Sequence, residues 1–147
     1  MYYSKNYHEG KKLDFVDLLK EHQLKATPQR LSVLKVLHKN EHPTIDELYE
    51  SIKNEHPSIS LATVYKNVNT LKEHGVVIEV NMPNGKMRYD IYTKPHIHVI
   101  CTTCGSVEDI DYSSDLYDYQ TKIEKDKNWI IDRMDVIATI KSCKNCK

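Results

Sequence analysis

The chain has 147 residues, of which 39% are hydrophobic, and its 21 lysines and arginines balance its 21 aspartates and glutamates. This length suffices for one ordinary domain or two small ones and excludes a third independent unit. A balanced charge neither predicts nor forbids a nucleic-acid partner. No apolar run is long enough to span a membrane, and the N-terminal segment lacks the apolar core of a signal peptide. We therefore expect a cytoplasmic protein without a membrane partner.

The first half of the chain predicts helices, because its apolar residues recur at helical spacing. These helices are expected at residues 13–22, from the N-cap Thr27 to near Asn40, after a capping box at residues 44–47, and from the cap Ser60 to Gly75. Pro28, directly after Thr27, supports the start of the second helix because proline is favoured at the first helical position.

Two β-rich runs follow these helices, at residues 76–80 and 87–92, and the Pro-Asn-Gly sequence at residues 83–85 between them is a strong turn signal. Helices followed by such a hairpin are typical of a winged helix-turn-helix, a DNA-binding architecture. In that architecture the helix beginning near Ser60 is the recognition helix.

A double-stranded DNA partner is favoured by polar side chains on the expected recognition helix, which would contact phosphates and base edges: Thr63, Tyr65, Lys66 and Asn67. The alternative is that these side chains form an ordinary exposed polar face. Residues 20–39 contain five lysines and arginines against one glutamate, a local basic excess that supports the DNA interpretation.

The second half predicts a small α+β domain after a short hinge at residues 93–95. Its expected elements are strands at 96–100 and 107–111, a polar helix at about 114–127 and a final strand at about 129–141. The domains would thus be residues 1–92, with the winged helix-turn-helix, and residues 93–147.

All four cysteines of the chain fall into two Cys-x-x-Cys pairs, Cys101 with Cys104 and Cys143 with Cys146. In a reducing compartment such pairs favour metal over a disulfide. Four thiolates saturate a tetrahedral Zn²⁺ ion, so the predicted site is closed and structural. A redox-active pair is disfavoured because one pair stands at the end of the sequence.

His96 and His98 remain outside this zinc site, and residues two apart on a strand project from the same face. They form half of a possible second metal site, although two solvated histidines are the plainer alternative. Candidate partners elsewhere are His42, Asp90 and Asp109. Such nitrogen and oxygen ligands suit Fe²⁺ or Mn²⁺ without excluding Zn²⁺.

Several motifs together resemble the ferric uptake regulator (Fur) family of bacterial metal-dependent repressors: TPQR at 27–30, HPTIDELY at 42–49, SLATVYKN at 60–67, HIHVICTTCG at 96–105 and CKNC at 143–146. The resemblance runs from about residue 13 onward. It implies a homodimer that binds A/T-rich inverted repeats, with Lys25, Tyr65 and Lys66 as DNA contacts. It also implies that the four cysteines hold structural zinc and that a regulatory metal is bound by His42, Asp90, His96, His98 and Asp109.

Carboxylate length points to one branch of the family. Positions 90 and 109 are aspartates here, where iron-sensing members usually carry glutamates, and this pattern resembles the peroxide-sensing members. In those members bound Fe²⁺ reacts with hydrogen peroxide, and the resulting oxidant attacks a ligating histidine, by position His42 or His96. Mn²⁺ would support repression but leave it insensitive to peroxide. Because Glu108 adjoins Asp109, an alignment shifted by one residue would make Glu108 the ligand in place of Asp109.

Three other functions fit the sequence less well. An iron- or zinc-responsive repressor on the same scaffold is disfavoured by the aspartates. A metal-dependent enzyme is disfavoured because no general base or substrate-orienting cluster is evident beside the histidines. A zinc-stapled interaction module would leave His42, His96 and His98 without a joint role. We therefore expect a transcriptional repressor and not an enzyme.

Overall fold

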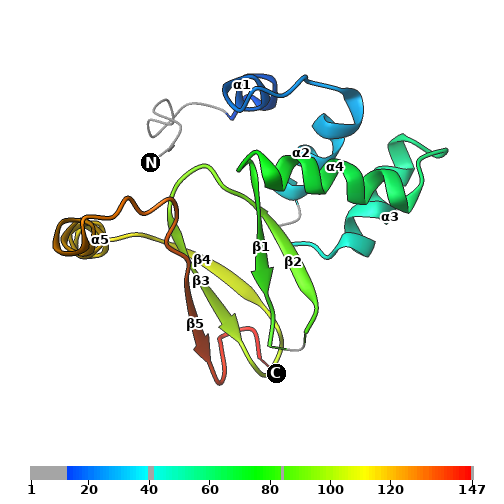
Figure 1. Cartoon of the computed structure of the whole chain (residues 1–147). Helices are drawn as coiled ribbons and strands as arrows, with labels where there is room; N and C mark the ends of the chain where they lie inside the picture. The colour runs from blue at the N-terminus through cyan, green and yellow to red at the C-terminus, as the bar shows by residue number, and fades with distance from the viewer. Residues whose placement is uncertain (1–12, 40–41, 84, 147) are drawn as a thin grey trace. The chain divides into compact units, whose positions relative to one another are not determined.

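The computed structural model describes residues 13–39, 42–83 and 85–146, and it divides into two compact units between Thr93 and Lys94 (Figure 1). The tyrosine-rich first twelve residues, the expected helix end at Asn40 and the turn residue Asn84 lie outside the described residues. None of the described helices is long and apolar enough to cross a membrane.

The N-terminal unit begins with four helices: α1 (Phe15–Glu21), α2 (Pro28–Lys39), α3 (Ile45–Glu55) and α4 (Leu61–Glu73). The predicted caps are present. Thr27 Oγ1 accepts a hydrogen bond from the Arg30 amide at 3.3 Å, and Ser60 Oγ accepts one from the Thr63 amide at 3.1 Å. Thr44 forms a reciprocal capping box with Glu47. These bonds satisfy amides that have no partner inside the helix, which is why α2, α3 and α4 begin where the sequence indicates.

Apolar residues from all four helices form one core. The most deeply buried members are Leu18 and Leu19 on α1, Leu34 and Leu37 on α2, Leu48 and Ile52 on α3, and Val64, Val68 and Leu71 on α4. Burying each such side chain contributes roughly 1.5–3 kcal/mol. The core therefore fixes how α3 and α4 are set against α2, and it leaves the polar side of α4 outward.

The wing of this unit is a two-stranded antiparallel hairpin, β1 (Val77–Asn81) and β2 (Met87–Ile91). Val77 is buried in the helical core and Val80 is also buried, whereas Glu79 between them is exposed. Lys72 near the end of α4 reaches Glu79 with a 2.8 Å ion pair. This pair ties the recognition helix to the wing, and the Glu79 carboxylate raises the pKa of Lys72.

The C-terminal unit contains a three-stranded sheet and one helix. Strand β3 (His96–Cys101) lies between β4 (Val107–Asp111), which is antiparallel to it, and β5 (Val136–Ile140), which is parallel to it; α5 (Ser114–Lys127) lies in the sequence between β4 and β5. The four helices, the hairpin and this small sheet confirm the expected α+β class and its DNA-binding architecture.

The last strand is shorter than expected, because only residues 136–140 of the predicted range 129–141 pair with β3. Asn128 ends α5 in the left-handed conformation, with φ of 52°. The residues that follow are bonded back to the helix: Trp129 donates its amide to the Glu124 carbonyl at 3.1 Å, and Ile131 donates its amide to the Glu124 carboxylate at 2.8 Å. Residues 129–135 thus form the connection from α5 to β5 and are not part of the strand.

Candidate metal centres and nucleic-acid interface

The four cysteine sulfurs lie within 4.8 Å of one another. The Sγ–Sγ distances are 3.3 Å between Cys101 and Cys146, 3.5 Å between Cys104 and Cys143, and 3.7 Å between Cys143 and Cys146. These are too long for disulfides, which measure about 2.05 Å. A tetrahedral zinc with bonds of about 2.3 Å separates its sulfurs by about 3.8 Å. The donor type and the spacing therefore fit Zn²⁺.

Two turns bring these sulfurs together. Cys101 ends β3, and the turn after it closes with a 2.8 Å hydrogen bond from the Gly105 amide to the Cys101 carbonyl. Gly105 has φ of 74°, in the left-handed region that favours glycine. In the second turn the Cys146 amide donates to the Cys143 carbonyl at 3.1 Å. Thr102 donates its amide to the Ile140 carbonyl at 2.9 Å, so the β3–β5 pairing holds the two turns in register.

Hydrogen bonding makes these thiols unequal as acids. The Ser106 hydroxyl and the Asn145 amide stabilise the Cys143 thiolate and lower the pKa of Cys143 to about 6. The amide of Cys104 is the main cause that lowers the pKa of Cys101. The Cys143 amide favours the Cys146 thiolate, but the bonds to neighbouring cysteines and desolvation outweigh it and raise the pKa of Cys146 to about 12. A cluster with stabilised thiolates suits a cation that displaces the remaining protons.

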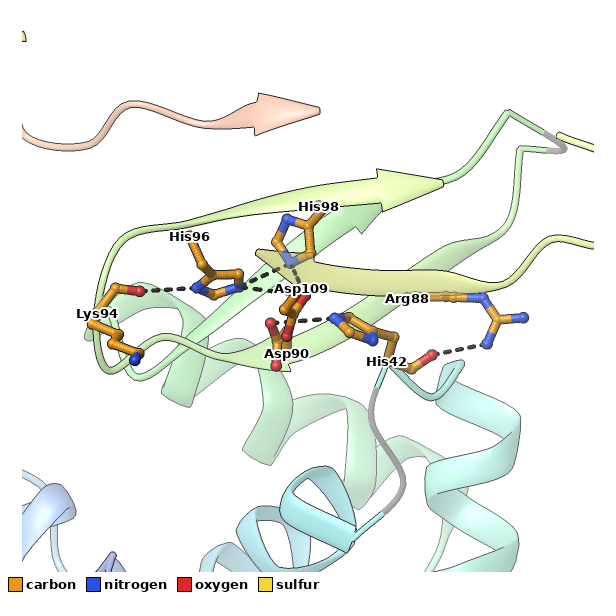
Figure 2. Close-up of polar contacts among 7 residues, drawn as sticks. All are labelled: His42, Arg88, Asp90, Lys94, His96, His98 and Asp109. Carbon is orange, nitrogen blue, oxygen red and sulfur yellow. Dashed lines mark hydrogen bonds and ion pairs between the residues drawn. The ribbon is translucent and has the colours of Figure 1, made fainter. Parts of the chain in front are cut away.

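In the N-terminal unit, His42 and Asp90 form a pair, with 3.4 Å between His42 Nε2 and Asp90 Oδ2 (Figure 2). His42 precedes α3 and is only 2% exposed, and Asp90 on β2 is 8% exposed. Two hydrogen bonds hold the His42-Pro43 segment against β2. Arg88 Nη1 donates to the His42 carbonyl at 2.8 Å, and the Tyr89 amide donates to the Pro43 carbonyl at 3.0 Å.

In the C-terminal unit, His96 and His98 project from β3 and face Asp109 on β4 (Figure 2). The two Nε2 atoms are 3.0 Å apart, and Asp109 Oδ1 lies 3.5 Å from His98 Nε2 and 3.8 Å from His96 Nε2. The register pairs His98 with Asp109, whereas Glu108 pairs with Val99 and, by strand alternation, projects from the other face. Asp109 is thus the carboxylate beside the histidines.

The ring orientation of His96 suits cation binding. His96 Nδ1 lies 2.9 Å from the Lys94 carbonyl, which can only accept a hydrogen bond, so Nδ1 carries the proton. The Nε2 lone pair is then directed toward His98 and Asp109. Metal-bound histidines commonly have their second nitrogen fixed by a carbonyl in this way. An imidazole and carboxylate donor set fits Fe²⁺, Mn²⁺ or Zn²⁺.

The expected DNA contacts all lie in the N-terminal unit. Tyr65 (42% exposed) and Lys66 point outward from α4, and Lys25 is exposed in the loop before α2. Thr63 and Asn67 are half-buried. The Thr63 hydroxyl lies 2.9 Å from Ser60 Oγ, and Asn67 Nδ2 donates to the Thr63 carbonyl at 3.0 Å. Their polar groups are therefore engaged within the helix, whereas Lys25, Tyr65 and Lys66 present theirs to solvent.

Two residues that support the site, Arg88 and Lys72, could not be identified from the sequence pattern. Arg88, which fixes the His42 backbone, differs from other basic residues only in standing two positions before Asp90, on the same side of β2. Lys72, which bridges α4 to the wing, lies seven residues from Glu79. A sequence-based search for ligands and phosphate contacts passes over both, because neither is itself a candidate ligand or helix-face contact.

A winged helix-turn-helix whose fourth helix exposes Tyr65 and Lys66, followed by a unit that carries a four-thiolate cluster and an imidazole and carboxylate set, defines a metal-dependent DNA-binding regulator. The sequence profile of the ferric uptake regulator family matches residues 21–139. The chain belongs to this family, whose members are transcriptional regulators and not enzymes.

Similar proteins agree with this assignment. The "Peroxide-responsive repressor PerR" of Staphylococcus saprophyticus is 34% identical over 134 residues, which are 90% of each chain. The crystal structure of a Campylobacter jejuni peroxide stress regulator has a TM-score of 0.77 and 53% identity, covering 91% of this chain and 100% of the other. The Vibrio cholerae ferric uptake regulator has a TM-score of 0.65 and 29% identity, covering 88% and 100%. Homologues in this family bind structural zinc and regulatory iron or manganese and act as DNA-binding homodimers.

Proposed function

We propose that the protein is a peroxide-sensing, metal-dependent transcriptional repressor that binds A/T-rich inverted-repeat operators as a homodimer. The observation that carries this proposal is that the carboxylate beside the histidines is an aspartate in both units. Asp90 contacts His42 and Asp109 faces His98, so both positions hold the shorter acid. The names of the similar proteins, a peroxide-responsive repressor and a peroxide stress regulator, support the same function.

The first metal site in this proposal is structural. Zn²⁺ would be held by Cys101, Cys104, Cys143 and Cys146, with no open position for a substrate or an oxidant. Cys101 ends the strand that carries both histidines, and the zinc ion would join the end of β3 to the turn after β5. Its role is to hold the sheet in shape while the second site reacts.

The second site is regulatory, with Fe²⁺ or Mn²⁺ bound by His42, Asp90, His96, His98 and Asp109. Two of these ligands belong to the N-terminal unit and three to the C-terminal unit. One ion held by both sets would limit the arrangements that the two units can adopt. Metal binding would thereby shift the population toward the shape that places both recognition helices on the operator.

Release from DNA would follow loss of one of these ligands. Bound Fe²⁺ would supply one electron to break the O–O bond of hydrogen peroxide beside the ligands; overall, one peroxide oxygen would go to a ring carbon of a histidine and the other would leave as water. His42 or His96 would then gain oxygen, and an oxidised imidazole is a poor metal ligand. Because His42 belongs to one unit and His96 to the other, losing either would weaken the link between them. The Mn²⁺ form would be insensitive because Mn²⁺ reacts poorly with peroxide.

On the DNA side, Lys25, Tyr65 and Lys66 would contact the phosphate backbone and base edges, with Thr63 and Asn67 beside them. Dimerisation would use the C-terminal unit. Its outer strands expose large apolar side chains, Ile110 on β4 and Ile137 and Ile140 on β5, that are 37–50% exposed in the single chain. The cytoplasm, where DNA and ferrous iron are available, would be the working compartment.

The decisive experiment compares two metal forms of the zinc-loaded protein. Operator binding is measured with Fe²⁺ and with Mn²⁺, before and after a low dose of hydrogen peroxide, and the peptides that hold His42 and His96 are examined by mass spectrometry. We expect the Fe²⁺ form to lose DNA affinity and gain oxygen on one of these histidines, and the Mn²⁺ form to do neither. An Fe²⁺ form that keeps its affinity and unmodified histidines, but releases DNA on chelation, would identify an iron-responsive repressor instead.

A further inference from the structure

Arg88 contacts the backbone of a proposed metal ligand from a strand far away in the sequence. Its Nη1 donates to the His42 carbonyl at 2.8 Å, between residues that are 46 positions apart (Figure 2). The Arg88 side chain is 26% exposed, and its Nη1 lies 3.9 Å from Glu47 Oε2. Among the described contacts of this guanidinium, the bond to His42 is therefore the close one. A charged donor on a partly buried carbonyl is among the stronger hydrogen bonds in proteins.

The conformation of His42 explains why such a bond is needed. His42 has φ of 58°, in the left-handed region that side chains with a β-carbon disfavour. Pro43 follows it, and a residue before proline prefers an extended backbone. A conformation disfavoured both by the residue's own β-carbon and by the following proline persists only where the surrounding structure holds it. Here β2 does so with consecutive residues, through the Arg88 side chain and through the Tyr89 amide on the Pro43 carbonyl.

The same guanidinium lies next to the start of α3. Glu47, its second neighbour, accepts a 3.1 Å hydrogen bond from the Thr44 amide and completes the capping box of that helix. Arg88 therefore stands between the carbonyl of His42 and the carboxylate that caps α3. Figure 2 shows the guanidinium at the carbonyl of His42, whereas Asp90 lies at the imidazole, where its Oδ2 is 3.4 Å from Nε2. Arg88 thus contacts the backbone of His42 and not the ligand atoms.

We propose that Arg88 is a positioning residue of the regulatory metal site: it holds the His42 backbone in the left-handed conformation, so that the imidazole stands beside Asp90 before the ion arrives. The inference rests on the proposed function, because it takes His42 as a ligand. Without the bond, His42 relaxes toward the extended backbone that Pro43 favours, and its imidazole turns away from Asp90. Arg88 is then a residue that sets metal affinity without touching the metal.

The test is a double-mutant cycle on the zinc-loaded, full-length protein. Arg88→Met, Arg88→Lys, His42→Ala and the Arg88→Met/His42→Ala double variant are titrated with Mn²⁺ in competition with a metal-binding dye, and each is melted without Mn²⁺. Arg133→Met removes an exposed arginine that pairs with Asp135 in the C-terminal unit, and it serves as the charge control. We expect Arg88→Met to weaken Mn²⁺ binding about 10-fold or more, the range found for residues that orient metal ligands.

Three further results separate positioning from general stability. Arg88→Lys should recover part of the affinity, because an ammonium group can still donate to the carbonyl. In the His42→Ala background, Arg88→Met should have no further effect on Mn²⁺ affinity, since both changes remove the same ligand. Arg133→Met should match the wild type. At saturating Mn²⁺, Arg88→Met should again bind operator DNA.

Two results would overturn the role of Arg88: wild-type Mn²⁺ affinity in Arg88→Met, whatever its melting temperature, or an equal loss of affinity with and without His42. Failure of the proposed function has a different signature, namely that His42→Ala itself leaves Mn²⁺ affinity unchanged. In that case His42 is not a ligand, and the positioning role falls with it.

Discussion

Asp109 faces His98 across two paired strands, and the register that brings them together also turns Glu108 to the other face. The choice between neighbouring acids is therefore made by strand alternation, and the site holds a side chain that is one methylene shorter than glutamate. Its carboxylate oxygen lies 3.5 Å from His98 Nε2. A glutamate at this position would extend its carboxylate farther across the histidines and change which positions around the ion stay open to peroxide.

Exchanging this acid tests the assignment at the residue scale. We expect Asp109→Glu to keep Mn²⁺-dependent operator binding but to respond to peroxide more weakly in its Fe²⁺ form. The measurement is the peroxide dose that releases half of the bound DNA. Glu108→Asp is the matched control, because it makes the reverse exchange on the opposite face of β4 and should behave as the wild type. An unaltered dose in Asp109→Glu would show that carboxylate length does not set the response.

Helix α4 is fixed at its start, along its buried face and near its end, while its polar face remains exposed. Ser60 caps its start, Val64, Val68 and Leu71 bury one face in the core, and Lys72 near its end pairs with Glu79 on the wing. The helix is therefore a rigid support for Tyr65 and Lys66. Rigid support matters because an exposed lysine contributes to DNA affinity mainly by releasing counterions from the phosphates, which requires it to lie close to them.

Neutralising one lysine tests the DNA-binding face at the element scale. We expect Lys66→Gln to weaken operator binding and to lower the salt dependence of that binding by about one ion equivalent, the effect of losing one phosphate contact. The measurement is the slope of log affinity against log salt concentration in the Mn²⁺ form. Lys122→Gln on the exposed side of α5 removes the same charge from the C-terminal unit and should leave the slope unchanged. Equal slopes in the wild type and Lys66→Gln would remove Lys66 from the interface.

On the scale of the whole molecule, the cysteine cluster joins segments near the beginning and the end of the C-terminal unit's sequence. It links the end of β3 to the turn after β5, and β4 and β5 expose the large apolar side chains that are proposed above for dimerisation. Cys101→Ser is expected to abolish zinc binding and, with it, dimer formation. Zinc content and molecular mass by light scattering measure both effects. A zinc-free variant that remains a folded dimer would contradict a structural role for the cluster.

Zinc affinity should also depend on pH. The pKa of Cys146 is raised to about 12, so its thiol is protonated at neutral pH and zinc must displace that proton. The pKa of Cys143 is lowered to about 6, so this group becomes a second competitor only when the pH falls that far. Zinc binding is therefore expected to release protons and to weaken steadily from about pH 8 to about pH 6. Competition with a chelator across this range measures it, and a constant affinity would contradict the raised pKa of Cys146.

Local signals predicted most of the secondary structure. The caps Thr27, Thr44 and Ser60 mark helix starts because each side chain bonds an amide only a few residues away. The strand at 129–141 was predicted too long because its start depends on a contact that local sequence does not specify. Residues 129–135 have the composition of a strand, but they make bonds back to Glu124 at the end of α5, a contact that depends on where the helix stops.

The sequence by itself determined which residues can bind metal, because ligand chemistry belongs to the side chain: paired cysteines, a His-x-His run and two aspartates are readable without coordinates. It also determined the helices, through contacts that span one turn. Only the tertiary structure decided that Asp109 and not Glu108 faces the histidines, and that Arg88 holds His42. Both depend on strand register and on contacts between distant residues, which local composition does not specify.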